Sequence, residues 1–236
     1  FTGRIGDPTG KEKSRPQLTE EEVLANADTY RQQFIKVLDP EQTILCFNSE
    51  WLDELKPSEL VEMMSKHTIA RILERDSFKK RMKSGQPIGL HELIYPMLQG
   101  MDSLNIEADI EIGGMDQKFN ILMGRDMQQK RGLEKQIAIF MPIIEGLDGV
   151  QKMSKSLNNY IGIDEAPEVM FNKVMTIGDH LIIKYFDLLT DITPAEIKHT
   201  ENLLRDKKVN PRDIKLSLAK EIVTCYHSKA MAEQAE

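Results

Sequence analysis

The sequence predicts an α/β protein in which a Rossmann-like parallel-sheet domain is followed by a small α-helical domain. Two observations support this prediction. Up to residue 141, short β-rich runs alternate with segments of helical periodicity, which is typical of βα units. After Tyr160 only helical patterns follow. We therefore expect the Rossmann-like domain over residues 1–150, a loop and linker over 151–164, and the helical domain over 165–236.

The composition is that of an ordinary globular protein. The 236 residues are 40% apolar and 29% charged, and no apolar run approaches the roughly 20 residues that a membrane-spanning helix needs. The net charge of -7 argues against a protein that coats nucleic acid non-specifically, although a local basic patch could still bind one RNA. Cys46 and Cys225 are isolated in the sequence, which predicts neither a metal site nor a disulfide and favours a cytoplasmic location.

The first residues have the pattern of the interior of a domain. Phe1-Thr2-Gly3 is typical of a strand end that enters a loop, so we expect an N-terminal portion to precede it. Residues 1–16 are rich in glycine but lack the spacing and the Ser or Thr of a P-loop. This stretch is either a turn with a charged face or, through Asp7, Lys11 and Arg15, part of a site for a charged substrate.

A helix and a strand are predicted next. A capping box that starts at Thr19 begins the helix, and Asp39-Pro40 ends it. Residues 43–47 are a short apolar run rich in β-formers, which predicts a buried strand. Asn48 and Trp51 follow this strand at its C-terminal end, where ligands bind in open α/β sheets.

Three polar residues share one face of a predicted helix. Residues 57–84 are predicted to be helical, with their basic run as a solvated face, and the next helix covers 88–104. Tyr95, Gln99 and Asp102 are spaced i, i+4 and i+7 among apolar neighbours. A buried polar group without a partner costs about 1–3 kcal/mol. The three residues therefore form either an internal hydrogen-bond network or the lining of a pocket for a polar small molecule.

A strand, a glycine turn and a helix follow. Residues 108–112 alternate as in a strand, Gly113-Gly114-Met115-Asp116-Gln117 forms the turn, and 119–129 are helical. This order is typical of nucleotide-binding α/β proteins, in which glycines allow close backbone approach and an acidic residue accepts hydrogen bonds from ribose. Residues 136–141 are predicted to be the last strand.

The stretch Lys152-Met153-Ser154-Lys155-Ser156 is predicted to be a mobile loop. Gly146, Gly149, Asn158 and Asn159 flank it, and Gly and Asn tolerate unusual backbone angles. Two ammonium groups on such a loop can close over a polyphosphate and stabilise charge that develops during a reaction. A lysine pair alone would more often be a solvated turn, so the order of Met and Ser between the lysines carries the functional interpretation.

The remainder of the chain is predicted to be helical. The helical stretches are 165–189, 193–207 and 210–235. Thr193-Pro194 and Asn210-Pro211 are typical of helix N-termini. These stretches predict the small helical domain.

Taken together, these motifs resemble those of bacterial tyrosyl-tRNA synthetases, which are class I aminoacyl-tRNA synthetases. The resemblance covers essentially the whole chain and includes the KMSKS loop, Lys152 to Ser156. The tryptophanyl enzymes are the nearest alternative, and Gly113-Gly114 ahead of the Asp-Gln pair favours the tyrosyl branch. The other stretches that carry the resemblance are Thr2-Gly3, Gly6-Asp7-Pro8-Thr9-Gly10-Lys11, Tyr95 with Leu98, Gln99 and Asp102, and Asp116-Gln117.

The resemblance implies activation of L-tyrosine with ATP, followed by transfer of the tyrosyl group to tRNA(Tyr). Asp102 would accept a hydrogen bond from the substrate phenol, and Gln117 would orient the substrate carboxylate. The substrate ammonium group would be held by Asp7, Tyr95 and Gln99. Two further residues match positions beside this pocket, Asn48 and Trp51.

The same resemblance implies the nucleotide site and the partners. Gly114 and Asp116 would bind the ATP ribose, and Mg²⁺ would accompany ATP without a protein metal site. A homodimer is expected, with contacts from helices in about 57–104, and no membrane association. The residues that would surround the pyrophosphate are Lys11, Arg15, Lys152, Lys155 and Ser156.

Parts of the family pattern are absent from this sequence. They are the His-rich turn, the first strand, the second phenol-binding residue and the C-terminal anticodon-binding domain. Their absence leaves open a second hypothesis, in which the chain is a synthetase-derived RNA-binding or regulatory protein without catalysis.

Overall fold

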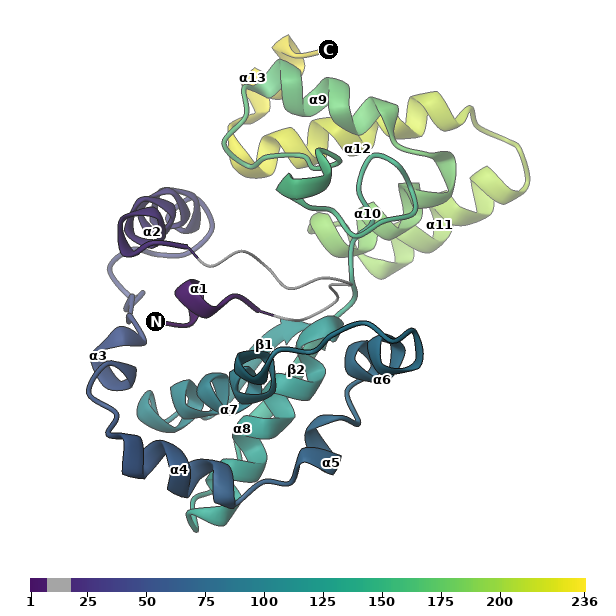
Figure 1. The fold of residues 1–236 in the computed structure, drawn as a ribbon. Helices are drawn as coiled ribbons and strands as arrows, with labels where there is room; N and C mark the ends of the chain where they lie inside the picture. The colour runs from purple at the N-terminus through teal and green to yellow at the C-terminus, as the bar shows by residue number, and fades with distance from the viewer. Residues whose placement is uncertain (8–17) are drawn as a thin grey trace. The chain divides into compact units, whose positions relative to one another are not determined.

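The computed structural model describes residues 1–7 and 18–236, which divide into two compact units (Figure 1). Unit 1 comprises Phe1–Arg31 and Pro40–Ile143. Unit 2 comprises Gln32–Asp39 and Ile144–Glu236. Lys11 and Arg15, two of the expected pyrophosphate ligands, lie outside the described residues.

Unit 1 contains a parallel βαβ arrangement. Strand β1 (Ile110–Gly114) pairs in parallel with β2 (Ile137–Met141), with Ile110 opposite Ile137. The 3₁₀ turn η1 (Met115–Gln117) and helix α8 (Lys118–Lys130) connect the two strands. Parallel strands need such a crossover connection. The arrangement confirms the predicted Rossmann-like α/β class and both strands of the glycine-turn region.

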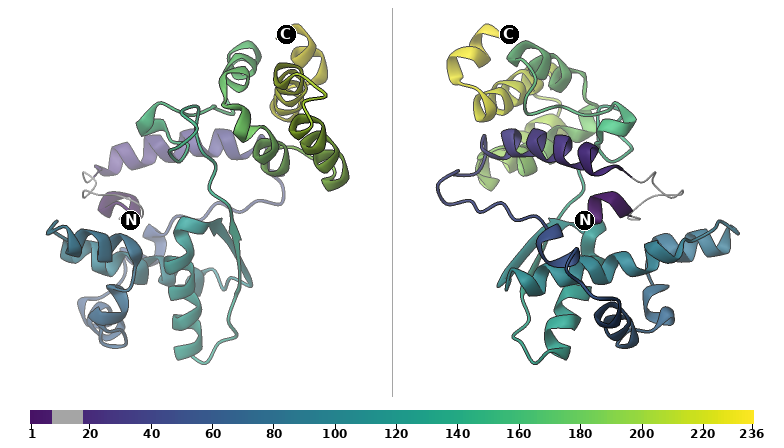
Figure 2. Two further views of the ribbon diagram at one scale, coloured as in Figure 1. Left: turned by 90° about the vertical axis from the view of Figure 1, so that its right-hand side faces the viewer. Right: turned by 60° about the vertical axis from the view of Figure 1, so that its left-hand side comes forward.

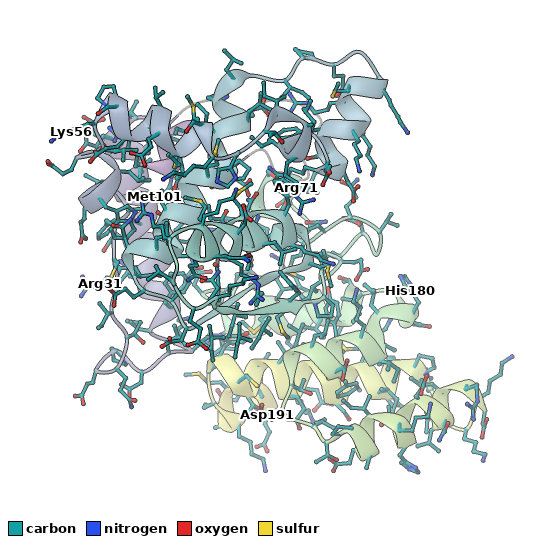
Figure 3. All side chains as sticks on the ribbon, turned by 90° about the horizontal axis from the view of Figure 1, so that it is seen from below. Arg31, Lys56, Arg71, Met101, His180 and Asp191 are labelled. Atoms are coloured by element: carbon teal, nitrogen blue, oxygen red, sulfur yellow. The ribbon has the colours of Figure 1, made fainter. Side chains whose placement is uncertain are left out.

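Helices make up most of the rest of unit 1. Helix α7 (Leu90–Asn105) lies side by side with α8 in Figures 1 and 2. Met101, labelled in Figure 3, is one of the buried residues of the apolar core around α7. The predicted helices are therefore present. The remaining helices that begin in this unit are α1 (Thr2–Ile5), α2 (Glu20–Phe34), α3 (Ser49–Leu52), α4 (Pro57–Ser65), α5 (Ile69–Ile72) and α6 (Asp76–Lys83).

Two strand predictions were wrong. Residues 43–47 are not a strand, and Ile44 is 87% exposed instead of buried. Within the described part of the chain, the sheet consists of β1 and β2, so this run has no neighbouring strand to receive its backbone hydrogen bonds. Phe1-Thr2-Gly3 leads into the short helix α1 instead of ending a strand. In both places β-propensity was a weak guide because a strand requires a partner.

Unit 2 has its own apolar core. The largest of its fully buried side chains is Tyr185, which packs with Met170, Ile182, Leu218 and Val223. Prolines at the starts of α11 and α12 match the predicted N-terminal signals. The elements are η2 (Lys155–Leu157), α9 (Pro167–Thr176), η3 (Asp179–Leu181), α10 (Ile182–Leu189), α11 (Pro194–Arg205), α12 (Pro211–Tyr226) and α13 (Lys229–Gln234).

Cys46 and Cys225 are both free and exposed. No helix in residues 1–7 and 18–236 is long and apolar enough to span a bilayer.

Candidate active site

Helix α7 places Tyr95, Gln99 and Asp102 on one face, as their spacing predicts. All three side chains are half-buried. The start of the helix is fixed by Glu92, whose Oε1 accepts the backbone N–H of Gly89 at 2.8 Å. Glu92 also forms a buried ion pair with Arg81 of α6, at 2.5 Å between Oε2 and Nη1. The three polar side chains thus lie on a helix whose first turn is fixed by the contacts of Glu92.

Asp102 is held by two donors from the segment around α3. The Trp51 indole Nε1–H donates to Asp102 Oδ1 at 2.9 Å, and Asn48 Nδ2 donates to Oδ2 at 3.1 Å. Asn48 Nδ2 also donates to Thr2 Oγ1 at 2.7 Å. Burial raises the pKa of Asp102, and the hydrogen bonds from Trp51 and Asn48 act in the opposite direction. The result is a fixed, partly desolvated hydrogen-bond acceptor.

A second polar cluster joins Gln99 to the glycine turn. Gln117 Nε2 donates to Asp7 Oδ2 at 2.9 Å. Asn120 Nδ2 donates to Gln99 Oε1 at 2.9 Å and to Gln117 Oε1 at 3.0 Å. Six of the predicted site residues therefore fall into two hydrogen-bonded clusters of unit 1. One cluster contains Asp102, Asn48 and Trp51, and the other contains Asp7, Gln99 and Gln117 joined through Asn120.

Two residues of this region were not identified from the sequence. Asn120 is 1% exposed and follows Gln117 by three residues, so helical spacing could have indicated it. Arg75 is 5% exposed, and its Nη2 lies 3.6 Å from Asp7 Oδ1. Burial lowers the pKa of Arg75, and the nearby charge of Asp7 opposes this shift. The prediction of a solvated basic face was wrong for Arg75 and Arg81, because both turn into the unit.

Gly113 and Gly114 were predicted to lie in the turn, but the structure places both in β1, paired with Phe140 and Met141. A Cβ atom at Gly114 would lie 2.5 Å from Asp116 Oδ1 and 3.3 Å from Ile143 Cδ1. Asp116 in turn borders a groove of about 900 Å³, which is also lined by Arg75 and Phe119. The glycine therefore allows the Asp116 carboxylate to lie directly against the strand end.

In unit 2 the lysine loop has a defined backbone. Lys152 pairs with Glu145 in an antiparallel bridge, and Met153 packs against the core of this unit. Ser154 Oγ accepts the backbone N–H of Leu157 at 3.3 Å and caps η2. Both Lys152 and Lys155 are exposed, as is Ser156. The loop thus exposes two ammonium groups from an ordered turn.

Solved structures share this fold. A C-terminally truncated mitochondrial tyrosyl-tRNA synthetase from Aspergillus nidulans matches with a TM-score of 0.73 and 22% identity, over 99% of this chain and 72% of that one. A tyrosyl-tRNA synthetase from Archaeoglobus fulgidus, solved with L-tyrosine, matches with a TM-score of 0.69 and 21% identity, over 92% of this chain and 75% of that one. At these identities the likeness concerns the fold.

Curated relatives are much closer in sequence. A tyrosine–tRNA ligase 2 of Clostridium acetobutylicum is 58% identical over all 236 residues of this chain, which cover 59% of the relative. A tyrosine–tRNA ligase of Carboxydothermus hydrogenoformans is 56% identical, again over the whole chain and 57% of the relative. The chain thus spans less than two thirds of the length of these relatives.

The family described as class I tRNA synthetases (W and Y) matches residues 1–236. This match includes the Asp102 cluster, the glycine turn and the lysine loop described above. The chain therefore belongs to the class I tRNA synthetases of the tryptophanyl and tyrosyl type.

Proposed function

We propose that this chain carries the amino-acid-activating centre of a tyrosine–tRNA ligase. The carboxylate of tyrosine attacks the α-phosphorus of ATP, and the bond between the α- and β-phosphates breaks. Tyrosyl-adenylate and pyrophosphate are the products, and the tyrosyl group is then transferred to the 3′ end of tRNA(Tyr). The observation that carries the proposal is the half-buried Asp102 carboxylate, fixed by Trp51 and Asn48.

Asp102 provides selection for a phenol. A tyrosine hydroxyl donates to the carboxylate, whereas phenylalanine would leave this half-buried charged acceptor without that bond. Hydrogen bonds to charged groups contribute about 1.5–3 kcal/mol. The relatives above, whose printed names are tyrosine–tRNA ligases, support tyrosine over tryptophan as the substrate.

The second cluster, around Gln117, would bind the ammonium and carboxylate groups of the amino acid. Asp7, Tyr95 and Gln99 accept hydrogen bonds from the substrate ammonium group. Gln117 is held between Asp7 and Asn120, which supports a role in orienting the reacting carboxylate. Fixing a substrate in this way lowers the entropic part of the barrier.

The nucleotide is bound by the glycine turn and by cations. Gly114 and Asp116 hold the ribose of ATP. No covalent enzyme intermediate is required, so catalysis consists of positioning the substrates and stabilising the departing pyrophosphate. Mg²⁺ enters with ATP. The proposed pyrophosphate ligands are Lys11, Arg15, Lys152, Lys155 and Ser156.

The partners and location also belong to this proposal. The protein acts in the cytoplasm as a homodimer, with contacts from helices in 57–104, and binds tRNA(Tyr). Several apolar residues of this region are exposed, including Val61 and Ile69, which supports an interface there. Light scattering measures the mass of the protein in solution, and a mass equal to that of a monomer would contradict the proposed homodimer.

Tyrosine-dependent ATP–pyrophosphate exchange by the full-length gene product tests the activity. Exchange should require L-tyrosine, and L-phenylalanine and L-tryptophan should not replace it. Exchange with tryptophan alone would assign the protein to the other branch of the family. Absence of exchange with every amino acid would leave the non-catalytic RNA-binding or regulatory hypothesis.

A further inference from the structure

Asn159 follows the lysine loop in the chain, and its side chain is buried, with 5% of the residue exposed. Its Oδ1 accepts the backbone N–H of Ser154 at 2.8 Å. Its Nδ2 donates to the backbone oxygen of Lys152 at 3.2 Å and to that of Gln151 at 3.4 Å. One side-chain amide therefore fixes the backbone on both sides of Met153, between the two lysines.

The orientation of this amide is set by Asp148. Asn159 Nδ2 also donates to Asp148 Oδ2, so the nitrogen must face Asp148 and the oxygen must face Ser154. Asp148 Oδ1 in turn accepts the backbone N–H groups of Val150 at 2.8 Å and Gln151 at 2.6 Å. Hydrogen bonds from Gln151, Asn159 and Val150 lower the pKa of Asp148, which keeps it an acceptor at neutral pH.

The chain also leaves room for this amide. A Cβ atom at Gly146 would overlap the Asn159 side chain. The backbone oxygen of Asn159 accepts the N–H of Leu147 at 2.8 Å, and Gly146 N–H donates to Gln151 O at 2.8 Å. The preceding residue, Asn158, is exposed and has φ 52°. Asn158 turns the chain, and Asn159 makes the contacts.

We propose that Asn159 is a positioning residue of the activation reaction, which acts by holding the backbone between Lys152 and Lys155 so that both ammonium groups reach the same departing pyrophosphate. This inference rests on the proposed function for its catalytic consequence. Asn159 itself touches no substrate. Its effect on rate arises because misplacement of charge-stabilising groups raises the barrier without changing binding of the amino acid.

The test compares four variants of the full-length gene product. Asn159→Ala removes the amide. Asn159→Asp keeps an acceptor for Ser154 N–H but places a carboxylate against Asp148. The double variant Asp148→Asn with Asn159→Asp restores a donor–acceptor pair with the roles exchanged. Asn158→Gly is the matched control, because glycine adopts φ 52° without strain.

We expect kcat for tyrosine-dependent pyrophosphate exchange to fall about 10–100-fold in Asn159→Ala and in Asn159→Asp, with KM for tyrosine within twofold. The double variant should recover part of the activity that Asn159→Asp loses, because the contact with residue 148 is restored while the donation to the Lys152 oxygen is not. Asn158→Gly should stay within twofold of the wild type. A kcat within twofold of the wild type in Asn159→Ala, or an equal rise in KM for tyrosine, would overturn the proposal. Failure of the double variant to improve on Asn159→Asp would overturn the role assigned to Asp148 in orienting the amide.

Hydrogen exchange separates this inference from the proposed function. Amides of residues 146–157 should exchange at least tenfold faster in Asn159→Ala than in the wild type, and at unchanged rates in Asn158→Gly. This readout needs no catalytic activity. If the wild type lacks pyrophosphate exchange but these amides still respond, the proposed function fails while the role of Asn159 in the loop stands. Unchanged amide exchange in Asn159→Ala would refute that role.

Discussion

The two polar clusters of unit 1, around Asp102 and around Gln117, and the lysine loop of unit 2 are built in opposite ways. In the clusters, the polar side chains themselves are fixed by residues distant in sequence, such as Trp51 on Asp102 and Gln117 on Asp7. In the loop, the backbone between the two lysines is fixed by Asn159, 5 and 7 positions away from the residues it bonds, and the lysine side chains are exposed.

This difference agrees with the two roles proposed above. A phenol and an ammonium group are best recognised by acceptors that do not move, because rearrangement would reduce selectivity. Cations on an accessible turn with a fixed backbone can stabilise charge that develops on a leaving group. The proposal therefore predicts that variants of the unit 1 clusters change affinity, whereas loop variants change rate.

The largest expected effect is that of Lys155→Ala. Loss of one group that stabilises transition-state charge typically costs about 2.7–4 kcal/mol. We therefore expect kcat for activation to fall about 100–1000-fold, with the Kd for tyrosine nearly unchanged, measured by pyrophosphate exchange and equilibrium dialysis. Lys198→Ala, which removes another exposed lysine of unit 2, is the control. A large rise in the Kd for tyrosine in Lys155→Ala would break the comparison.

Asp102→Ala should show the opposite behaviour. Loss of a hydrogen bond to a charged group, about 1.5–3 kcal/mol, predicts tyrosine binding weaker by about 10–150-fold. Calorimetry measures this directly, with the exposed Asp187→Ala as the control. Unchanged tyrosine affinity in Asp102→Ala would remove this residue from the pocket.

A smaller effect is expected for the support of the loop. The Tyr185 hydroxyl donates to the backbone oxygen of Glu145 at 2.6 Å, and burial raises the pKa of Tyr185 to about 12. Tyr185→Phe should lower the free energy of unfolding by about 1–2 kcal/mol at pH 8, because the Glu145 carbonyl loses its donor. Urea denaturation measures this difference.

The sign of the pH dependence follows from the raised pKa of Tyr185. The neutral phenol is favoured in the folded state, so its stabilisation is present below pH 10 and is lost as pH rises towards 12. The difference between wild type and Tyr185→Phe should therefore shrink over this interval. A constant difference up to pH 12 would contradict a buried phenol.

The smallest expected effect is on the stability of the substrate-free protein, through the ionisation of Asp102. Because the folded-state pKa of Asp102 is raised, its ionised form opposes folding at neutral pH, and this cost disappears as pH falls below the ordinary aspartate value. The free energy of unfolding of the wild type, relative to that of Asp102→Asn, should therefore be slightly lower at pH 7 than near pH 4, as measured by urea denaturation. A wild type that gains stability relative to Asp102→Asn between pH 4 and pH 7 would show that the hydrogen bonds from Trp51 and Asn48 outweigh desolvation.

The same contrast explains what the sequence could predict. The strand, glycine turn and helix around Asp116, and the shared helical face of Tyr95, Gln99 and Asp102, depend on short spacing and were found. The prediction of a strand at residues 43–47 was wrong, because a strand forms only where another strand lies beside it.

Residues that act through distant or unexpected contacts were also missed. The basic run of residues 69–83 predicts exposure for Arg75, yet this residue is buried near Asp7, because burial depends on packing that spacing does not encode. For Asn159 the sequence predicts only a tolerance of unusual backbone angles. That property belongs to Asn158, and nothing in the local pattern separates the two asparagines.

The local bonding of the lysine loop has a consequence for protein engineering. The hydrogen bonds of the segment from Glu145 to Asn159 named above end within residues 144–185, all of which belong to unit 2. A chimera of two related enzymes joined between Ile143 and Ile144 would thus transfer the turn together with its scaffold. Under the proposed function, such exchanges would change the rate of activation while amino-acid selectivity is inherited from the other parent.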